Sequence, residues 1–297
     1  MTDILRIDAA ATVEPRLAIG VFAHNEASGI EACLESLRPQ LLPGDVCHVL
    51  NNGSTDDTGR VVAAYSKRHP FCRLVDIEVG DKSNAWNVFV HDIAPDADVL
   101  VFHDGDCRVK GQALAALRHG FNAAPHAHAL AAVPDPAISP KFHRLMLTGP
   151  GIAGNLYALS RAFIERARQL RVRLPLGWIG DDSLVGALAF WDLDPTGGWD
   201  PSRIAVMTEA QFEYDPFSPW SLADLRLQYR RKIRYALRHR QSQMLHPLLK
   251  KEGLSAMPPT VLDLYRRAGP PRPVQGFGPA AWFDRLARQR IVSALAS

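Results

Sequence analysis

Two carboxylates follow an apolar run near the end of the first third of the chain. Residues 99–102 have the length and composition of a buried strand, and the chain continues through His103 into Asp104-Gly105-Asp106. Carboxylate oxygens suit Mg²⁺ or Mn²⁺, and such an ion can also bind phosphate oxygens. An ordinary turn after a strand is the alternative, because Asp and Gly are common turn residues. The metal site is therefore the better interpretation only if other segments of the sequence bring polar residues to the same place.

Polar residues also follow the three apolar stretches that come earlier in the chain. Residues 17–23, 46–50 and 73–79 have the pattern of strands, and a polar loop and a helical pattern follow each one. This repeat is typical of a doubly wound parallel sheet, in which the carboxyl ends of the strands share one edge. Helix capping needs one polar residue per loop, whereas these loops hold several. We therefore interpret the shared edge as a nucleotide site.

The same loops resemble those of the inverting nucleotide-sugar glycosyltransferases of family two. The resemblance is carried by FAHNEASGIEACLESL (22–37), NNGSTDDT (51–58), the stretch with Lys82, Ala85 and Asn87, and HDGDC (103–107). Their order and spacing match over about the first 190 residues. The resemblance implies the GT-A fold, an α/β fold with a mostly parallel sheet flanked by helices. It also implies an enzyme that moves a sugar from a nucleoside diphosphate, with UDP as the expected nucleotide, to an acceptor hydroxyl with inversion.

The resemblance implies roles for individual residues of these loops. The nucleotide pocket would be lined by Ala23, Glu26, Asn52 and Lys82. Asp104 and Asp106 would be the DxD pair that holds Mg²⁺ or Mn²⁺ on the donor diphosphate. We expect neighbours in the same loops to contribute to the donor site: His24, Asn25, Ser54, Asn87 and Gly105. The family often has Asp at the position of Asn51 or Asn52, and Asn can both donate and accept hydrogen bonds there, so the base stays open.

A second pair of acids, Asp181-Asp182, begins a helical pattern that runs to residue 190. Either acid could simply cap that helix and favour its dipole. The pair also resembles the family's acidic pair, usually Glu-Asp, whose second member is the catalytic base. The resemblance implies that Asp182 is the base and that Asp181 replaces Glu. The reaction needs such a group, because an acceptor hydroxyl is a poor nucleophile until a carboxylate takes its proton.

Two further segments are expected near the sugar and the acceptor. The glycine-rich loop 149–154 would allow close backbone approach to a ligand, although a merely flexible loop has the same composition. The resemblance favours function, and we assign Gly154 and Asn155 to this site. Residues 220–243 predict a basic helix in which Gln228, Arg231 and Lys232 faintly resemble the Gln-x-x-Arg-Trp element of processive relatives, with Lys in place of Trp. We assign Arg231 to the same site.

Charge divides the chain into two parts. Residues 221–297 hold 15 Lys and Arg against 4 Asp and Glu, whereas the rest holds 19 against 27. The basic end predicts either a solvated face or an anionic partner, and the latter includes peripheral contact with a membrane surface. We predict a catalytic domain over 1–219, with a nucleotide-sugar-binding half (15–110) and an acceptor-binding half (111–219). A basic helical extension over 220–297 follows.

Composition and motifs limit the remaining possibilities. The four cysteines show no CxxC or zinc spacing, no N-terminal stretch resembles a signal peptide, and no apolar run reaches the roughly 20 residues of a membrane span. We expect a cytoplasmic enzyme with a carbohydrate, lipid-linked or small-molecule acceptor and no nucleic-acid partner. One rival is a nucleotidyltransferase, but His24-Asn25-Glu26 is not the glycine-rich phosphate loop it would need. The other is a non-catalytic protein that binds nucleotide sugar, or nucleic acid through the basic helix.

Overall fold

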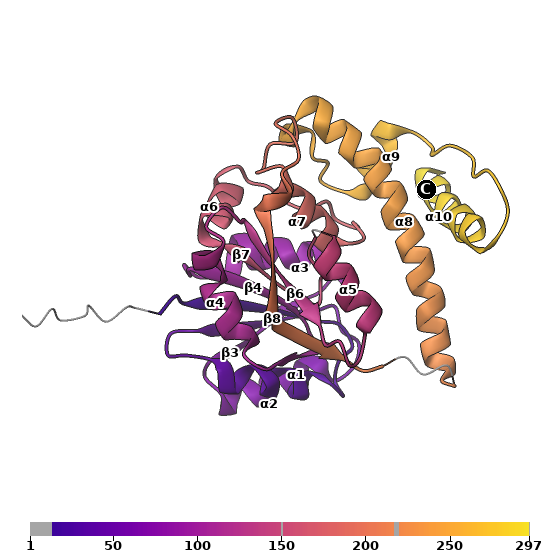
Figure 1. Ribbon diagram of the computed structural model, residues 1–297. Coiled ribbons are helices and arrows are strands. Elements are labelled where there is room, and N and C mark those ends of the chain that lie inside the picture. Colours follow the sequence, from indigo (N-terminus) through magenta and orange to yellow (C-terminus); the bar gives the residue numbers. More distant parts are fainter. Residues whose placement is uncertain (1–13, 150, 217–219, 297) are drawn as a thin grey trace, which may run out of the picture.

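Eight strands form one sheet in the computed structural model, which describes residues 14–149, 151–216 and 220–296 (Figure 1). In the order of the sheet they are β3 (Cys72–Ile77), β2 (Val46–Asn52), β1 (Leu17–Ala23), β4 (Val99–Asp104), β7 (Leu156–Ser160), β6 (Ala129–Pro134), β8 (Ile204–Tyr214) and β5 (Cys107–Lys110). Four of the seven strand pairs are parallel, which confirms the predicted mostly parallel α/β sheet.

The parallel pairs at one end of the sheet place the predicted donor loops together. β3, β2, β1 and β4 are mutually parallel, and every residue of β1 is buried, as its apolar sequence requires. The connecting helices are α1 (Ile30–Leu37), α2 (Thr58–Arg68) and α3 (Lys82–Val88). Phe22 of β1 is level with Asp104 of β4, and Ala23 is level with Asn51 of β2. The loops that follow these strands therefore meet at one edge.

The second half of the sheet is mixed. β7 is antiparallel to both β4 and β6, and β5 is antiparallel to β8. The helices of this half are α4 (Ala113–Ala123), α5 (Pro140–Thr148), α6 (Arg161–Gln169) and α7 (Asp181–Phe190). The sequence did not reveal β5. It also predicted only residues 204–207 of β8, which continues to Tyr214.

Aromatic rings beneath the donor edge hold four elements in fixed relation. Phe102 of β4 stacks on Tyr157 of β7 with ring centroids 4.6 Å apart, and Trp86 of α3 stacks on Phe102 at 6.0 Å. Phe22 of β1 also stacks on Phe102, at 6.2 Å. Such offset rings bury large apolar areas and favour one geometry. This cluster fixes the positions of the polar residues that follow the same strands and the first turn of α3.

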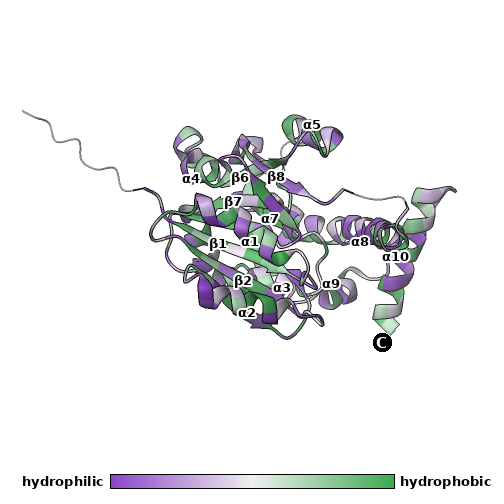
Figure 2. Ribbon diagram, turned by 90° about the horizontal axis from the view of Figure 1, so that it is seen from below, coloured by the Kyte–Doolittle hydropathy of each residue, from purple (hydrophilic) through white to green (hydrophobic). Residues whose placement is uncertain are grey.

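Three helices form the C-terminal part: α8 (Leu222–Glu252), α9 (Val261–Ala268) and α10 (Pro279–Ala296). α8 runs along one side of the α/β body, and α10 lies outside it (Figures 1 and 2). Gln241 of α8 fastens this part to the body, because its Oε1 accepts a hydrogen bond of 3.0 Å from the Ile179 backbone N–H. The predicted basic helix is confirmed, whereas the predicted domain boundary falls beside residues 217–219, outside the described residues, and stays a prediction. Within the described ranges, no helix has both the length and the apolar character that crossing a bilayer demands.

Candidate active site

Hydrogen bonds tie the loops after β1 and β2 to each other. The Asn25 N–H donates to Ser54 Oγ at 3.0 Å, and Asn25 Oδ1 accepts from the Thr55 N–H at 2.8 Å. Asn25 adopts a left-handed backbone with φ of 58°, which Asn tolerates better than most residues. Part of the polar excess in these loops therefore holds their shape. Asn25 and Ser54 lie at the predicted edge, where their hydrogen bonds connect the loop after β1 to the loop after β2.

The loop before α3 joins the same edge. His24 Nδ1 lies 2.7 Å from the backbone oxygen of Asn52, and Asn52 Oδ1 accepts from the Asp81 N–H at 2.9 Å. Asn51 donates instead to Asp76 Oδ1 at 2.7 Å. Asp76, at the edge-facing end of β3, is a carboxylate that our reading of the sequence missed. It places an acidic group beside Asn51, at the edge where the nucleotide is predicted to bind.

Lys82 links the donor edge to the second acidic pair. Asp81 caps α3 by accepting from the Ser83 N–H at 2.9 Å, and this cap fixes the first turn that carries Lys82. Lys82 Nζ lies 2.6 Å from Asp104 Oδ1 and 3.7 Å from Asp181 Oδ2. Burial opposes the charge of Lys82, but these two carboxylates outweigh it and raise the pKa of the ammonium. Lys82 is therefore a permanent cation between the two predicted halves.

The glycine-rich loop lies against both acidic pairs. The Gly154 N–H donates to Asp182 Oδ2 at 3.2 Å, and a Cβ at this position would lie only 3.1 Å from Lys82 Nζ. The Asn155 backbone oxygen accepts from the Asp104 N–H at 3.0 Å. A side chain at position 154 would therefore crowd the ammonium. The structure thus brings Gly154 and Asn155 to the predicted site.

Asp181 and Asp182 have different surroundings at the start of α7. Asp181 is 7% exposed, and burial together with Asp182 raises its pKa against the opposing effect of Lys82. Asp182 is more accessible, with a side chain 21% exposed that lies 3.8 Å from Arg238 Nη1. Of the two acids, Asp182 is therefore the more accessible to solvent.

The structure shows the surroundings of three further predicted site residues. Asn87 is buried and holds both polar backbone groups of Leu174, at 2.9 and 2.8 Å, so it supports the core rather than the donor edge. Gly105 lies close to β1, since a Cβ at this position would be 3.1 Å from the Phe22 backbone oxygen. Arg231 is seven residues before Arg238, about 10 Å along α8, and Arg238 is the arginine that contacts Asp182.

Asp104 and Asp106 are the residues that could hold a divalent ion. Burial raises the pKa of Asp104 to about 7, with Lys82 opposing and Asp106 adding to the shift. Among the described residues, no group of three or more His, Cys, Asp and Glu side chains has a metal-binding arrangement. Mg²⁺ commonly binds through one or two carboxylates together with substrate phosphates and water. The two acids fit an ion shared with a diphosphate rather than a site built from protein alone.

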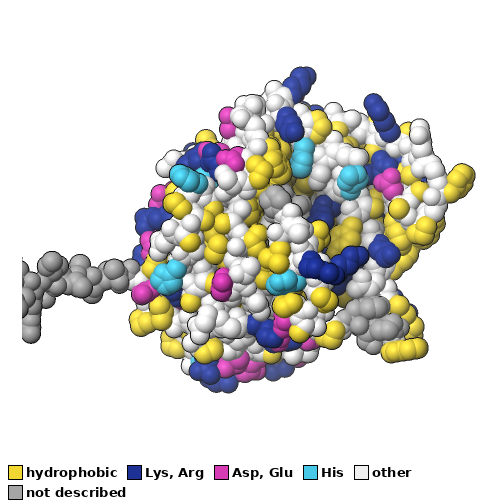
Figure 3. Space-filling model, in the orientation of Figure 1, with side chains coloured by type: hydrophobic (Ala, Val, Ile, Leu, Met, Phe, Trp, Pro, Cys, Tyr) yellow, Lys and Arg dark blue, Asp and Glu magenta, His cyan; other side chains and the backbone are white. Residues whose placement is uncertain are grey.

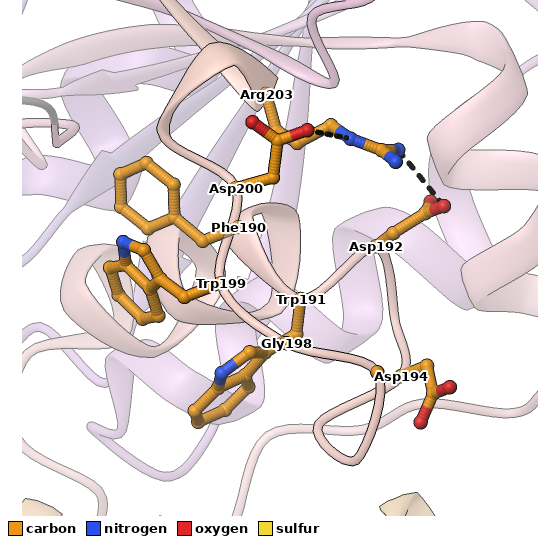
Figure 4. Close-up of a pocket in the computed structure, with 9 residues that line it drawn as sticks. Phe190, Trp191, Asp192, Asp194, Gly198, Trp199, Asp200 and Arg203 are labelled. Carbon is orange, nitrogen blue, oxygen red and sulfur yellow. Dashed lines mark hydrogen bonds and ion pairs between the residues drawn. The ribbon is translucent and has the colours of Figure 1, made fainter.

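The surface has a hollow beside α8 and a separate cavity at the far end of α7. Figure 3 shows a hollow between the α/β body and α8, with Lys and Arg side chains along its border. A separate cavity of about 380 Å³ lies at the other end of α7, where Phe190, Trp199 and the Asp200–Arg203–Asp192 ion pairs line it (Figure 4). About 12 Å of helix separates Asp182 from Phe190. That cavity holds none of the predicted site residues.

Comparison with known proteins identifies the family. The model of glycosyl transferase family 2 matches residues 18–174, more than half of the chain. A search of curated proteins finds no match. The matched residues include β1 to β4, β7 and the loops that carry Lys82, Asp104 and Gly154.

Solved structures with the same fold are similar over most of this chain. A mannosyltransferase from Pyrobaculum calidifontis, in complex with GDP-Man and Mn²⁺, gives a TM-score of 0.57 at 20% identity, covering 96% of this chain and 75% of that one. GalNAc-T7 with UDP, GalNAc and Mn²⁺ gives 0.53 at 13%, covering 86% and 57%. Glucosyl-3-phosphoglycerate synthase from Mycobacterium tuberculosis, with Mn²⁺, UDP-glucose and phosphoglyceric acid, gives 0.50 at 18%, covering 89% and 83%. At these identities the likeness shows the GT-A fold, and the family match shows the class: the chain belongs to glycosyl transferase family 2 and is a glycosyltransferase.

Proposed function

We propose that this enzyme transfers a sugar from a nucleoside diphosphate donor to an acceptor hydroxyl, with inversion at the anomeric carbon. The observation that carries the proposal is the position of Lys82, 2.6 Å from Asp104 and 3.7 Å from Asp181. Asp104 belongs to the predicted diphosphate site, and Asp181 directly precedes the predicted base in the first turn of α7. These two contacts of one ammonium support a donor sugar bound between the two acidic pairs.

Asp182 is the proposed general base. The Gly154 N–H, 3.2 Å from Asp182 Oδ2, holds the carboxylate in place, and Arg238 flanks its other oxygen. A carboxylate in this position can take the proton of an acceptor hydroxyl as the oxygen attacks the anomeric carbon. Attack from the face opposite the diphosphate is a single displacement, which inverts the configuration.

The reaction also requires that the negative charge on the departing diphosphate be neutralised. Lys82 supplies one fixed positive charge beside Asp104. Asp104 and Asp106 would hold a divalent cation, which, when bound, would neutralise negative charge on the diphosphate oxygens. We propose Mn²⁺ or Mg²⁺; the three similar structures are each named with Mn²⁺.

The donor and acceptor are proposed as classes. Two of the similar structures are named with UDP or UDP-glucose and one with GDP-Man, so both nucleotides are reasonable donors to test. The acceptor is proposed to be a carbohydrate, a lipid-linked molecule or a small molecule such as the phosphoglyceric acid of the third structure.

Thermal unfolding with a panel of nucleotide sugars tests the proposal. A ligand that binds only the folded state raises the melting temperature by mass action. We expect one nucleotide sugar to raise it only when Mn²⁺ or Mg²⁺ is present, and Asp104→Asn to remove that increase. Asp92→Asn, the same change at an exposed carboxylate that pairs with Arg173 outside the proposed site, should keep the metal dependence. The absence of metal-dependent stabilisation by every donor would contradict the proposal.

A further inference from the structure

The C-terminal part of the chain exposes more than half of the large apolar side chains that are exposed among the described residues. Of the 16 such side chains exposed among the described residues, nine lie between Trp220 and Val292. Leu222 is 72% exposed and Phe277 is 98% exposed. Exposed apolar groups gathered in one region mark a binding surface more often than single ones do.

Several of these side chains form one continuous surface. A groove of about 430 Å³ on α8 and α10 is lined by Leu222, Leu225, Arg226, Tyr229, Arg230, Ile233 and Arg290. Tyr229 continues it onto α10, where the Trp282 ring lies 6.0 Å away and is 46% exposed. We call these residues, with Trp282, the α8–α10 surface. It combines leucine and aromatic side chains with three arginines.

The arginines of this surface have no acidic partner among the side chains that the structure describes. Among the described side chains, no carboxylate lies within ion-pair distance of Arg226, Arg230 or Arg290, whereas the buried Arg240 pairs with Asp284 to join α8 to α10. The helix α8 has only two acids in its sequence, Asp224 and Glu252. The surface is therefore both apolar and cationic.

We propose that the α8–α10 surface docks onto an anionic lipid bilayer. Membrane-surface helices place leucine and aromatic side chains at the boundary of head groups and acyl chains, and place Arg and Lys against anionic head groups. A nucleic acid would engage the arginines but leave Leu222 and Leu225 in water. The three arginines favour a partner that carries negative charge. The exposed leucines favour a partner that also offers an apolar region. Docking would present the hollow beside α8 to molecules held at the bilayer.

Vesicle co-sedimentation of the full chain tests this docking without donor or acceptor. We expect binding to vesicles of phosphatidylcholine with phosphatidylglycerol, little binding to phosphatidylcholine alone, and weaker binding at high salt. Each arginine near an anionic surface contributes, so Arg226→Glu with Arg230→Glu should weaken binding by about tenfold or more. Leu222→Asp with Leu225→Asp should weaken it comparably through the apolar contact.

Matched variants elsewhere separate the surface from overall charge. Arg60→Glu with Lys67→Glu makes the same charge change on α2, and Leu170→Asp changes a leucine that is 56% exposed at the end of α6; both should bind vesicles as the wild type does. Equal loss in these controls, equal binding to neutral vesicles, or no vesicle binding would overturn the proposal. So would a dimer, measured by light scattering, that Leu222→Asp with Leu225→Asp abolishes, because a second copy would then cover the surface. Thermal unfolding of each variant establishes that it is folded.

Discussion

Lys82 Nζ and Asp104 Oδ1 are 2.6 Å apart, and this contact lies between the last residue of β4 and the first residue of α3. The same ammonium also lies 3.7 Å from Asp181, at the start of α7. A single side chain thus joins Asp104 and Asp181, which are 77 residues apart in the sequence. The contact gives Lys82 both a structural and a catalytic part in our account.

Lys82→Met should destabilise the protein, because it leaves Asp104 and Asp181 without their cation. Removing one partner of a buried ion pair costs about 3 kcal/mol or more. The loss should be larger at pH 8 than at pH 6, since Asp104, with its pKa raised to about 7, can take up a proton at the lower pH. Urea unfolding of the variant and of Lys67→Met, a lysine exposed on α2, measures this difference. A loss that does not change with pH would contradict the prediction.

Asp182→Asn should abolish transfer while donor binding persists. Loss of a general base reduces kcat by about 10²–10⁴-fold, and Asp182 does not contact the predicted diphosphate residues. Asp181→Asn is the matched comparison, and we expect it to retain more activity because Asp181 is buried against Lys82. Turnover and donor affinity measured on both variants decide between the two acids. Greater loss of kcat in Asp181→Asn would reverse the proposed roles.

Gly154→Ala should reduce transfer with little loss of stability. The added Cβ would lie 3.1 Å from Lys82 Nζ, so the flexible lysine must move away from its contacts. We expect kcat/KM for the donor to fall by about tenfold, which is the cost of roughly 1.4 kcal/mol. Gly151→Ala in the same loop has open space around its Cβ and should behave as the wild type. Equal activity in the two variants would contradict the prediction.

Glu26 should make the protein less stable as the pH rises. Burial first, and then the nearby Asp106 and Asp56, raise the pKa of Glu26 from 4.5 to about 7. The folded state therefore binds this proton more tightly than the unfolded state, and the stability that protonated Glu26 supports is lost between pH 4.5 and about 7. The loss is at most about 3 kcal/mol, because some solvent screens the group.

Glu26→Gln tests this dependence, since glutamine has no charge to bury. Without added metal, the variant should be more stable than the wild type at pH 8, and the difference should shrink as the pH falls to 5. Melting temperatures of both proteins across this range provide the measurement. A constant difference would show that Glu26 is not the group responsible.

Arg238→Gln should reduce transfer more than Arg231→Gln does. The Arg238 guanidinium lies 3.8 Å from Asp182, so its loss removes the cation that flanks the proposed base. We expect kcat to fall by about tenfold in Arg238→Gln, which corresponds to roughly 1.4 kcal/mol. An equal fall in Arg231→Gln, about 10 Å away along α8, would favour the residue that the sequence suggested.

Much of the site could be predicted because polar residues concentrate where buried strands end. Apolar runs identified β1, β2 and β4, so Asp104, Asn52 and Glu26 were assigned to one edge before their contacts were known. The acids at the start of α7 were also recognisable from local sequence, because Gly180 and Asp181 mark where that helix begins. These features depend on local sequence, and the structure agrees with them.

The remaining residues depend on contacts that local sequence does not contain. Helical spacing shows that Arg231 and Arg238 share a face of α8, but not which turn packs beside Asp182. Asn87 looked like a loop residue because nothing in its neighbourhood reveals its hydrogen bonds to Leu174. β5 has only four residues and pairs with β8, which is a hundred residues away in sequence. Tertiary packing decides each of these cases.

We propose that Asp182 promotes a single, inverting displacement on a metal-bound nucleotide sugar. Proton NMR of donor turnover, with water as acceptor until a better one is found, observes the first anomer of the released sugar directly. With Mn²⁺ and an α-linked donor, we predict that β-sugar appears first, before mutarotation, and that Asp182→Asn shows no turnover. First release of α-sugar, or unchanged turnover in Asp182→Asn, would contradict the account.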